Sequence, residues 1–327
     1  MTAVANKQSH LISVIIPVFN SIKFIDETLN SVLNQSHQNL EIIVVDDGST
    51  DGSLDILKSI EDKRLRSVRN KGNGACAARN YGFQLSKGDY IQFLDADDLL
   101  SEHKIKKQLD LIKDADNCMA ICSTCHFTDL PDNGTVTDRD FLNSTNKPKE
   151  FMLKLLGSDG ANFEMVQTSA WLTPRKCIDK AGLWDESLQK DQDGEFFCRV
   201  AAHCAGILYE PSVLNYYRKH RGKNNISNKK ERAHLESQLR SLESKSVQLK
   251  SESHTLAYQN AMALQYKNLA IEAYPEYGDI SKKALDRSKD FGASDYLPVL
   301  GGRMVELIKL TFGWKAAKQL KKWVNSF

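Results

Sequence analysis

The first hundred residues alternate short, strongly apolar runs with helical patterns, and this alternation constrains the fold more than any other feature of the sequence. Residues 12–18, 41–45 and 90–94 form compact apolar runs that end in polar or turn residues, which is typical of buried strands. Between these runs, apolar residues recur at helical spacing over 24–33 and 54–60. This order predicts an α/β fold whose mainly parallel sheet is connected by right-handed crossovers.

The carboxyl ends of the predicted strands are where chemistry is expected. In open parallel sheets, ligands bind just beyond these ends, so the residues that follow each strand are the first candidates for a binding site. The residues at these positions are Asn20, Asp46, Asp47 and the segment 95–98.

The segment Phe-Leu-Asp-Ala-Asp-Asp places Asp95, Asp97 and Asp98 directly after the third strand. Hard oxygen ligands of this kind suit Mg²⁺ or Mn²⁺, which usually couples one or two carboxylates to substrate phosphates. Surface turns and helix caps use the same residues, so Asp-x-Asp alone is a weak signal. For Asp98 in particular, the alternative is a cap for the helix that follows through Ile112.

Two further segments predict contacts with a nucleotide. An Asp within 44–53 can accept a hydrogen bond from a base or a ribose, although a simple turn explains the same residues. Residues 70–82 open a helix with glycines and carry Arg79 one turn in, which favours a diphosphate. The Gly-x-Gly-x-x-Ala pattern there also raises a dehydrogenase, but these glycines do not follow the first strand. The three acids at 95–98 would moreover repel a diphosphate unless a cation intervened.

Four segments in this order resemble family-two inverting glycosyltransferases of the glycosyltransferase A-type fold. They are Ser-Val-Ile-Ile-Pro-Val-Phe-Asn, Val-Val-Asp-Asp-Gly-Ser-Thr-Asp, Gly-x-x-x-Ala-Arg-Asn-x-Gly and Phe-Leu-Asp-Ala-Asp-Asp, and the resemblance covers about residues 11–227. It implies that Asp95 contacts the ribose and that Asp97 ligates Mn²⁺ or Mg²⁺. Asn20 and Asp47, at the same strand ends, are expected to line the nucleotide-sugar site. The residues that the resemblance implies hold the nucleotide are Pro17, Phe19, Asp46 and Arg79.

Family members also supply an acid near the acceptor, usually as Glu-Asp with an Arg six residues after the Asp. Here Asp193 and Arg199 are kept, whereas Gln192 replaces the Glu. Inverting transfer needs a base for the acceptor proton, and the resemblance assigns that role to Asp193. The alternative is that Asp193 caps a helix. His220 follows the last strand and is a candidate for the metal or the diphosphate, or else an ordinary surface histidine.

Several aromatic and cysteine residues have two interpretations. Trp171 and Trp184 could stack on an acceptor sugar, although tryptophan is more commonly a core residue. Cys122-x-x-Cys125-His126 resembles half a zinc site, but no second pair has suitable spacing, which favours buried cysteines of a strand. The seven cysteines form an odd and sparse set, which favours a reducing cytoplasm.

The rest of the chain predicts a long functional loop over 126–165, a strand over 166–172 and a helix over about 191–205. After Ser227 the composition changes to charged helix, which predicts a transferase domain at 1–227 and a helical region at 228–327. The segment 303–327 is basic, amphipathic and tryptophan-containing. It suits either the surface of an anionic membrane or docking on the domain.

Together these features predict an inverting transferase that moves a sugar from a nucleotide diphosphate sugar, with uridine the expected base, to a glycan or lipid-linked acceptor. The expected setting is surface polysaccharide or glycolipid synthesis, in the cytoplasm or on the inner face of the membrane. A net charge of +2 gives no reason to expect nucleic acid as a partner. The alternatives are a nucleotidyltransferase with the same phosphate apparatus and an inactive nucleotide-binding scaffold of a polysaccharide complex.

Overall fold

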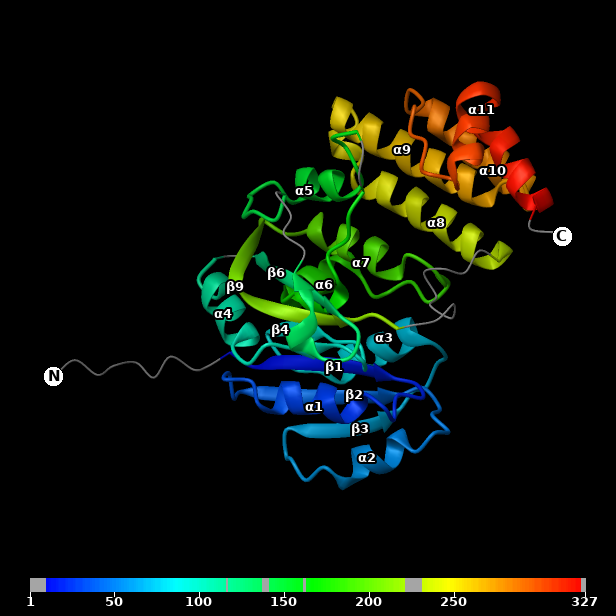
Figure 1. Ribbon diagram of the computed structural model, residues 1–327. Helices are drawn as coiled ribbons and strands as arrows, with labels where there is room; N and C mark the ends of the chain where they lie inside the picture. Colours follow the sequence, from blue (N-terminus) through cyan, green and yellow to red (C-terminus); the bar gives the residue numbers. More distant parts are fainter. Residues whose placement is uncertain (1–9, 116, 137–140, 161–162, 221–230, 325–327) are drawn as a thin grey trace. The chain divides into compact units, whose positions relative to one another are not determined.

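The computed structural model describes residues 10–115, 117–136, 141–160, 163–220 and 231–324 of the chain. They fall into two compact units, whose elements Figure 1 labels. The first unit comprises Met1–Pro148, Val166–Glu186 and Val200–Arg221. The second comprises Lys149–Met165, Ser187–Arg199 and Gly222–Phe327. The sequence prediction drew one boundary near residue 228 from the onset of charged helix. The second unit takes in two earlier stretches as well.

The first unit is built on a five-stranded sheet in the order β3-β2-β1-β4-β8. Parallel pairing joins β1 to β2 and β4, and β2 to β3, whereas β8 runs antiparallel to β4 at the edge. The register places Val18 opposite Asp46 and Ile15 opposite Phe93, so the ends of β1, β2 and β4 meet at one edge of the sheet. The strands are β1 Ile12–Val18, β2 Leu40–Asp46, β3 Leu65–Arg69, β4 Tyr90–Phe93 and β8 Thr173–Pro174.

Both faces of this sheet are covered, which explains why its inner strands are continuous apolar runs. On one face Ile42 and Val44 of β2 pack in a core cluster with Leu29 of α1. On the other face Ile43 packs with Ala78 of α3. The helices of the first unit are α1 Ile25–Leu33, α2 Ser53–Ser59, α3 Ala75–Leu85, α4 Lys104–Ile112 and α6 Arg175–Ala181.

A second sheet, in the order β5-β9-β6-β7, completes the first unit. Its longest strands, β6 and β9, run parallel, with a register irregularity between Cys122 and Ser123. The strands are β5 Leu99–Leu100, β6 Cys118–Phe127, β7 Thr135–Val136 and β9 Gly206–Arg218.

Two sequence predictions in the middle of the chain were wrong in detail. The long loop expected over 126–165 contains the end of β6, strand β7 and helix α5 (Pro148–Leu155), although 137–140 and 161–162 lie outside the described residues. The strand expected over 166–172 is a short 3-10 turn at Thr168–Ala170, followed by one antiparallel bridge between Leu172 and Ala120. The secondary structure of these segments therefore follows their tertiary packing rather than their local sequence pattern.

The second unit is helical. Helix α8 packs with α9 and α10 around Leu239, Tyr266 and Ile280, and α11 packs on α9 through Ala317 and Ile271. Across the described ranges, no helix is both long enough and apolar enough to cross a membrane. The remaining helices are α7 Gln192–Ala201, which begins in this unit, α8 Arg232–Gln248, α9 Leu256–Ala273, α10 Gly278–Asp290 and α11 Arg303–Val324.

Candidate active site

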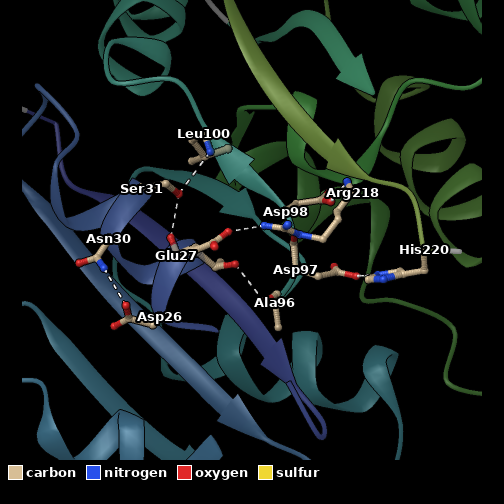
Figure 2. Close-up of polar contacts among 11 residues, drawn as sticks. Asp26, Glu27, Asn30, Ser31, Ala96, Asp97, Asp98, Leu100, Arg218 and His220 are labelled. Atoms are coloured by element: carbon tan, nitrogen blue, oxygen red, sulfur yellow. Dashed lines mark hydrogen bonds and ion pairs between the residues drawn. The ribbon is translucent and has the colours of Figure 1, made fainter. Parts of the chain in front are cut away.

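Asp97 and His220 form a pair at the sheet edge. His220 follows the end of β9, and its Nε2 lies 2.6 Å from Asp97 Oδ2. Figure 2 shows the two side chains pointing toward one another. Each side chain is about one-third exposed, at 33% for Asp97 and 38% for His220. Burial and then the charge of Asp95 raise the pKa of Asp97, while His220 acts in the opposite direction. A cation beside such a carboxylate stabilises its charged form.

Asp97 and His220 suit a cation site in which the substrate supplies further ligands. Over the part of the chain that the structure describes, no group of three or more His, Cys, Asp or Glu side chains could hold a metal ion. One carboxylate and one imidazole nonetheless fit Mg²⁺ or Mn²⁺ that takes its remaining ligands from substrate phosphates and water. Asp97 and His220 are therefore the residues that could share a cation with a diphosphate.

Asp98 is not a helix cap, in contrast to the alternative that the sequence left open. Helix α4 begins only at Lys104, and His103 occupies its N-cap. The carboxylate of Asp98 is buried, where it accepts hydrogen bonds from Ser169 Oγ at 3.0 Å and from the backbone N–H of Arg218 at 3.1 Å. Burial, then Asp97 and Asp95, raise its pKa well above the usual range. Asp98 thus connects the end of β4 to the end of β9.

Arg218 is the site residue that sequence reasoning missed. It is the last residue of β9 and is buried, with its guanidinium packed over the rings of Phe24 and Phe127. Its Nε donates to the backbone carbonyl of Asp97 at 3.0 Å, and its Nη2 lies 2.5 Å from Glu27 (Figure 2). Arg218 therefore ties the backbone at Asp97 to β9, the strand that leads to His220. The feature of the sequence that could have indicated Arg218 is its position two residues before His220.

Arg79 extends from the glycine-opened helix α3 to the same edge. Its Nη2 lies 2.6 Å from Asp95 Oδ1, and the guanidinium stacks on Trp184 with 4.5 Å between its carbon and the ring centroid. The neighbouring Asn80 donates to the carbonyl of Trp184 and accepts from the backbone N–H of the same residue. The structure therefore brings Arg79, Asp95 and Asp97 to one edge of the sheet.

The ends of β1 and β2 form the other side of this edge. Asp46 is buried and accepts the backbone N–H groups of the following turn, which is the turn role that the sequence left as an alternative. Asp47 fixes the glycine-containing segment before α3. Its carboxylate accepts hydrogen bonds from the Asn70 side chain at 2.6 Å and from the backbone N–H of Gly74 at 2.8 Å. Asn20 has a positive φ of 49° and accepts from the backbone of Thr50.

Phe19 and Pro17 are the remaining residues predicted to hold the nucleotide. Phe19, directly after β1, is 59% exposed, an unusual position for a large apolar side chain and one that suits stacking on a ligand. Pro17 is half-buried within β1.

Asp193 belongs to the second unit and is the second residue of α7, where it is half-buried. The residue directly before the helix is Asp191 rather than Asp193. Asp193 therefore lies inside the first turn of the helix rather than at the position before it. The arginine six residues on, Arg199, pairs with Glu195 at 2.8 Å.

The remaining sequence candidates are structural. Trp171 and Trp184 are only 1% and 3% exposed, so they are core residues rather than a platform for a sugar. Cys122 and Cys125 are buried in β6, as the alternative to a zinc site predicted.

Comparison with known proteins identifies a matching family and several related sequences. The model of the family described as glycosyl transferase family 2 matches residues 13–180. An uncharacterized glycosyltransferase of Haemophilus influenzae is 46% identical over 105 residues, which cover 31% of this chain and 42% of that protein. Glycosyltransferase GlyG of Streptococcus pneumoniae is 34% identical over 184 residues, which cover 54% of this chain and 59% of GlyG. The matched segments thus span less than two-thirds of these relatives.

A third relative and a solved structure extend the comparison. TuaG of Bacillus subtilis, a candidate glycosyltransferase of teichuronic acid biosynthesis, is 45% identical over 105 residues, covering 31% of this chain and 42% of TuaG. The crystal structure of S. aureus TarS 1-349 in complex with UDP-GlcNAc superposes with a TM-score of 0.60 at 17% identity. That superposition covers 89% of this chain and 95% of TarS 1-349, so the two share the fold.

Proposed function

The chain belongs to glycosyl transferase family 2, whose model matches half of it, and from this membership we propose that it moves a sugar with inversion from a nucleotide diphosphate sugar to an acceptor hydroxyl. The observation that carries the proposal is the meeting of Arg79, Asp95, Asp97 and His220 at one sheet edge. A guanidinium and a cation-binding pair are what a diphosphate requires. The fold shared with TarS, which was solved with UDP-GlcNAc, supports a UDP-linked donor.

In this proposal the strand ends hold the nucleotide. Phe19 offers an exposed ring for the base, and Asp95 lies beside Arg79, where a ribose hydroxyl and a diphosphate would follow one another. Asp46 and Asp47 shape the turn and the glycine segment against which the nucleotide lies. Pro17, two residues before Phe19, and Asn20, directly after it, are the other proposed contacts of the nucleotide sugar at the end of β1.

Asp97 and His220 would hold Mn²⁺ or Mg²⁺ together with the phosphates. A bound cation supplies charge neutralisation for the departing nucleoside diphosphate. Arg79 would also neutralise charge on the departing nucleoside diphosphate, and Asp95 and Trp184 hold its guanidinium in place.

Asp193 is the proposed base. During transfer, the bond between the anomeric carbon and the diphosphate oxygen breaks as the acceptor oxygen bonds to the opposite face of the sugar. Asp193 takes the proton of the acceptor hydroxyl, and the nucleoside diphosphate leaves with the electron pair of the broken bond. The two nearby acids have structural partners, because Asp191 pairs with Lys245 and Glu195 pairs with Arg199.

For the acceptor, we propose a surface polysaccharide or its lipid-linked precursor. The relationship to TuaG supports a polysaccharide, and helix α11 supports a lipid surface. The first half of α11 presents exposed side chains of Met304, Leu307 and Leu310. An apolar helical face of this kind suits the interfacial region of a membrane.

The product of the reaction tests the proposed activity. We expect UDP to be released from UDP-GlcNAc or another UDP-sugar in the presence of Mn²⁺, and a thermal-shift screen of nucleotide sugars with and without Mn²⁺ identifies the donor. Release of pyrophosphate would instead indicate a nucleotidyltransferase. Binding without turnover of any donor, with polysaccharide or water as acceptor, would indicate an inactive scaffold.

A further inference from the structure

One face of helix α8 holds the segment that leads into α7. Ser237, Ser241, Ser244 and Lys245 recur at spacings of three and four residues, so they share one face of the helix. Ser237 Oγ accepts from the backbone N–H groups of Gln189 and Lys190 at 2.8 and 3.0 Å, and it donates to the carbonyl of Lys190 at 3.0 Å. One hydroxyl thus fixes the backbone just before Asp191.

Asp191 is held by a buried ion pair. Lys245 Nζ lies 2.6 Å from its Oδ2, and Ser241 Oγ donates to the same oxygen at 2.7 Å. The lysine side chain is only 4% exposed, and Asp191 adopts a positive φ of 61°, which is uncommon outside glycine. A Cβ at Gly194 would come within 2.3 Å of Asp191 Oδ1 and 2.8 Å of Lys245 Nζ. The pair is therefore packed directly against the first turn of α7.

Glu195 is held in the same way from the other side of Asp193. Its carboxylate forms two hydrogen bonds with Arg199, at 2.8 and 2.9 Å, and accepts from Ser244 Oγ at 2.7 Å. The acids two residues before and two residues after Asp193 are thus both bonded to α8. Asp193 therefore lies between Asp191 and Glu195, whose carboxylates are both held by side chains of α8.

We propose that Lys245, supported by the serines of the same α8 face, is a positioning residue that sets the orientation of Asp193 for proton transfer. This inference rests on the proposed function, in which Asp193 is the base. A buried ammonium demands a partner, so Asp191 cannot leave it without a large penalty, and the turn that carries Asp193 is held in one arrangement. Burial by itself would lower the pKa of Lys245, but Asp191 chiefly, with a smaller contribution from Asp193, raises it. The charge of Asp193 is therefore within electrostatic reach of the lysine.

The test compares the full-length parent with Lys245→Met and with Lys283→Met as the matched control. Lys283 is an exposed lysine of α10 that pairs with Glu243 of α8. For Lys245→Met we expect kcat for UDP release from UDP-GlcNAc with Mn²⁺ to fall by roughly tenfold to a hundredfold, because the base is misplaced. The donor KM and the Kd for UDP should stay within about twofold of the parent. Hydrogen exchange over residues 189–195 should become faster in Lys245→Met and stay unchanged in Lys283→Met.

A double variant separates positioning from stability. Asp191→Asn with Lys245→Met removes both charges, so no unpaired charge remains buried and the fold should recover much of its stability. We expect kcat to stay low in the double variant. Parental kcat in either the single or the double variant, or unchanged exchange over 189–195 in Lys245→Met, would overturn the proposal.

Failure of the proposed function gives a different pattern. If Asp193→Asn keeps parental turnover, or if the parent turns over no nucleotide sugar, the assigned base or activity is wrong. The exchange measurement still judges whether Lys245 fixes the turn in that case.

Discussion

At the scale of single residues, the pair of Asp97 and His220 carries the proposed metal site. Asp97→Ala removes the carboxylate, so we expect the Mn²⁺-dependent gain in UDP affinity to disappear while the metal-independent affinity remains. Calorimetry with UDP, with and without Mn²⁺, measures both quantities. Asp89→Ala is the matched control, because Asp89 forms an exposed pair with His10 in the same unit. Equal metal-dependent affinity in Asp97→Ala and the parent would remove Asp97 from the site.

Lys104 makes a pH-dependent contribution to stability that is independent of the proposed reaction. Its ammonium is fully buried on α4 and donates to Gln92 and Gln108, and burial lowers its pKa to about 8 from 10.5. The charged lysine therefore opposes folding below pH 8, and this penalty is relieved as the pH rises from about 8 to 10.5. We expect the free energy of unfolding of the parent, relative to Lys104→Met, to rise by on the order of 3 kcal/mol across that range.

Urea unfolding of the parent and Lys104→Met at several pH values measures this difference. Lys107→Met removes an exposed lysine from the same helix and is the control. A difference between the parent and Lys104→Met that does not change with pH would contradict the lowered pKa.

The site could be predicted from the sequence where its residues directly follow strands. Asp95 and Asp97 were singled out because their cluster directly follows a buried run and stands in order with three other motif segments, and the structure brings both to the sheet edge with Arg79 and His220. The roles of Asp98 and Arg218 could not be predicted in this way. Their hydrogen bond joins residues 120 positions apart in the sequence, and only the pairing of β9 with β5 and β6 brings those positions together.

At the scale of elements, the strands of the parallel sheet were the most predictable. Strands β1, β2 and β4 are covered on both faces, so their burial appears in the sequence as continuous apolar runs. Helix α5 was missed because it has only eight residues and follows a stretch rich in Asp, Asn and Gly, so its apolar pattern is too short to stand out. The segment 166–172 has the composition of a strand, but among the residues that the structure describes it pairs through Leu172 alone.

Helix α7 offers a test of how rigidly its first turn is packed. Alanine usually stabilises a helix relative to glycine by up to about 1 kcal/mol. At Gly194 the added methyl group would overlap the buried pair of Asp191 and Lys245, so we expect Gly194→Ala to destabilise the protein by about 1–3 kcal/mol. Urea unfolding measures the effect. Gly278→Ala at the start of α10 is the control, because a Cβ there meets nothing within 4 Å. A stabilised Gly194→Ala would show that the pair yields easily.

At the scale of the whole molecule, the two halves of α11 differ in how they are packed, and this difference bears on the two roles that the sequence left open. Its second half is docked within the helical unit, where Lys318 and Lys321 donate to the carbonyls of Ile271 and Leu300. Two of the lysines that suggested a membrane surface thus serve packing. Most exposed large apolar residues of the helix, Met304, Leu307, Leu310 and Phe312, lie in its first half, before the break in helical geometry at Gly313, whereas Trp323 and Val324 are exposed at its end.

This division predicts which substitutions affect membrane binding. Leu307→Ser with Leu310→Ser removes the exposed apolar face without touching the docked half, so we expect the protein to move from sedimented anionic liposomes into the supernatant. Val247→Ser with Leu256→Ser is the control, since these residues are 65% and 75% exposed elsewhere in the helical unit. Equal sedimentation of both double variants would exclude this face as the membrane contact.

The most direct test of the whole account is donor turnover by Asp193→Asn, measured beside UDP binding and a melting curve. Asparagine keeps the size of the side chain but removes the charge that accepts a proton. We expect parental binding of UDP with Mn²⁺, a melting temperature close to the parent, and a loss of UDP-sugar turnover by a factor on the order of 10² to 10⁴. Near-parental turnover in Asp193→Asn would contradict this expectation and would move the base to another residue.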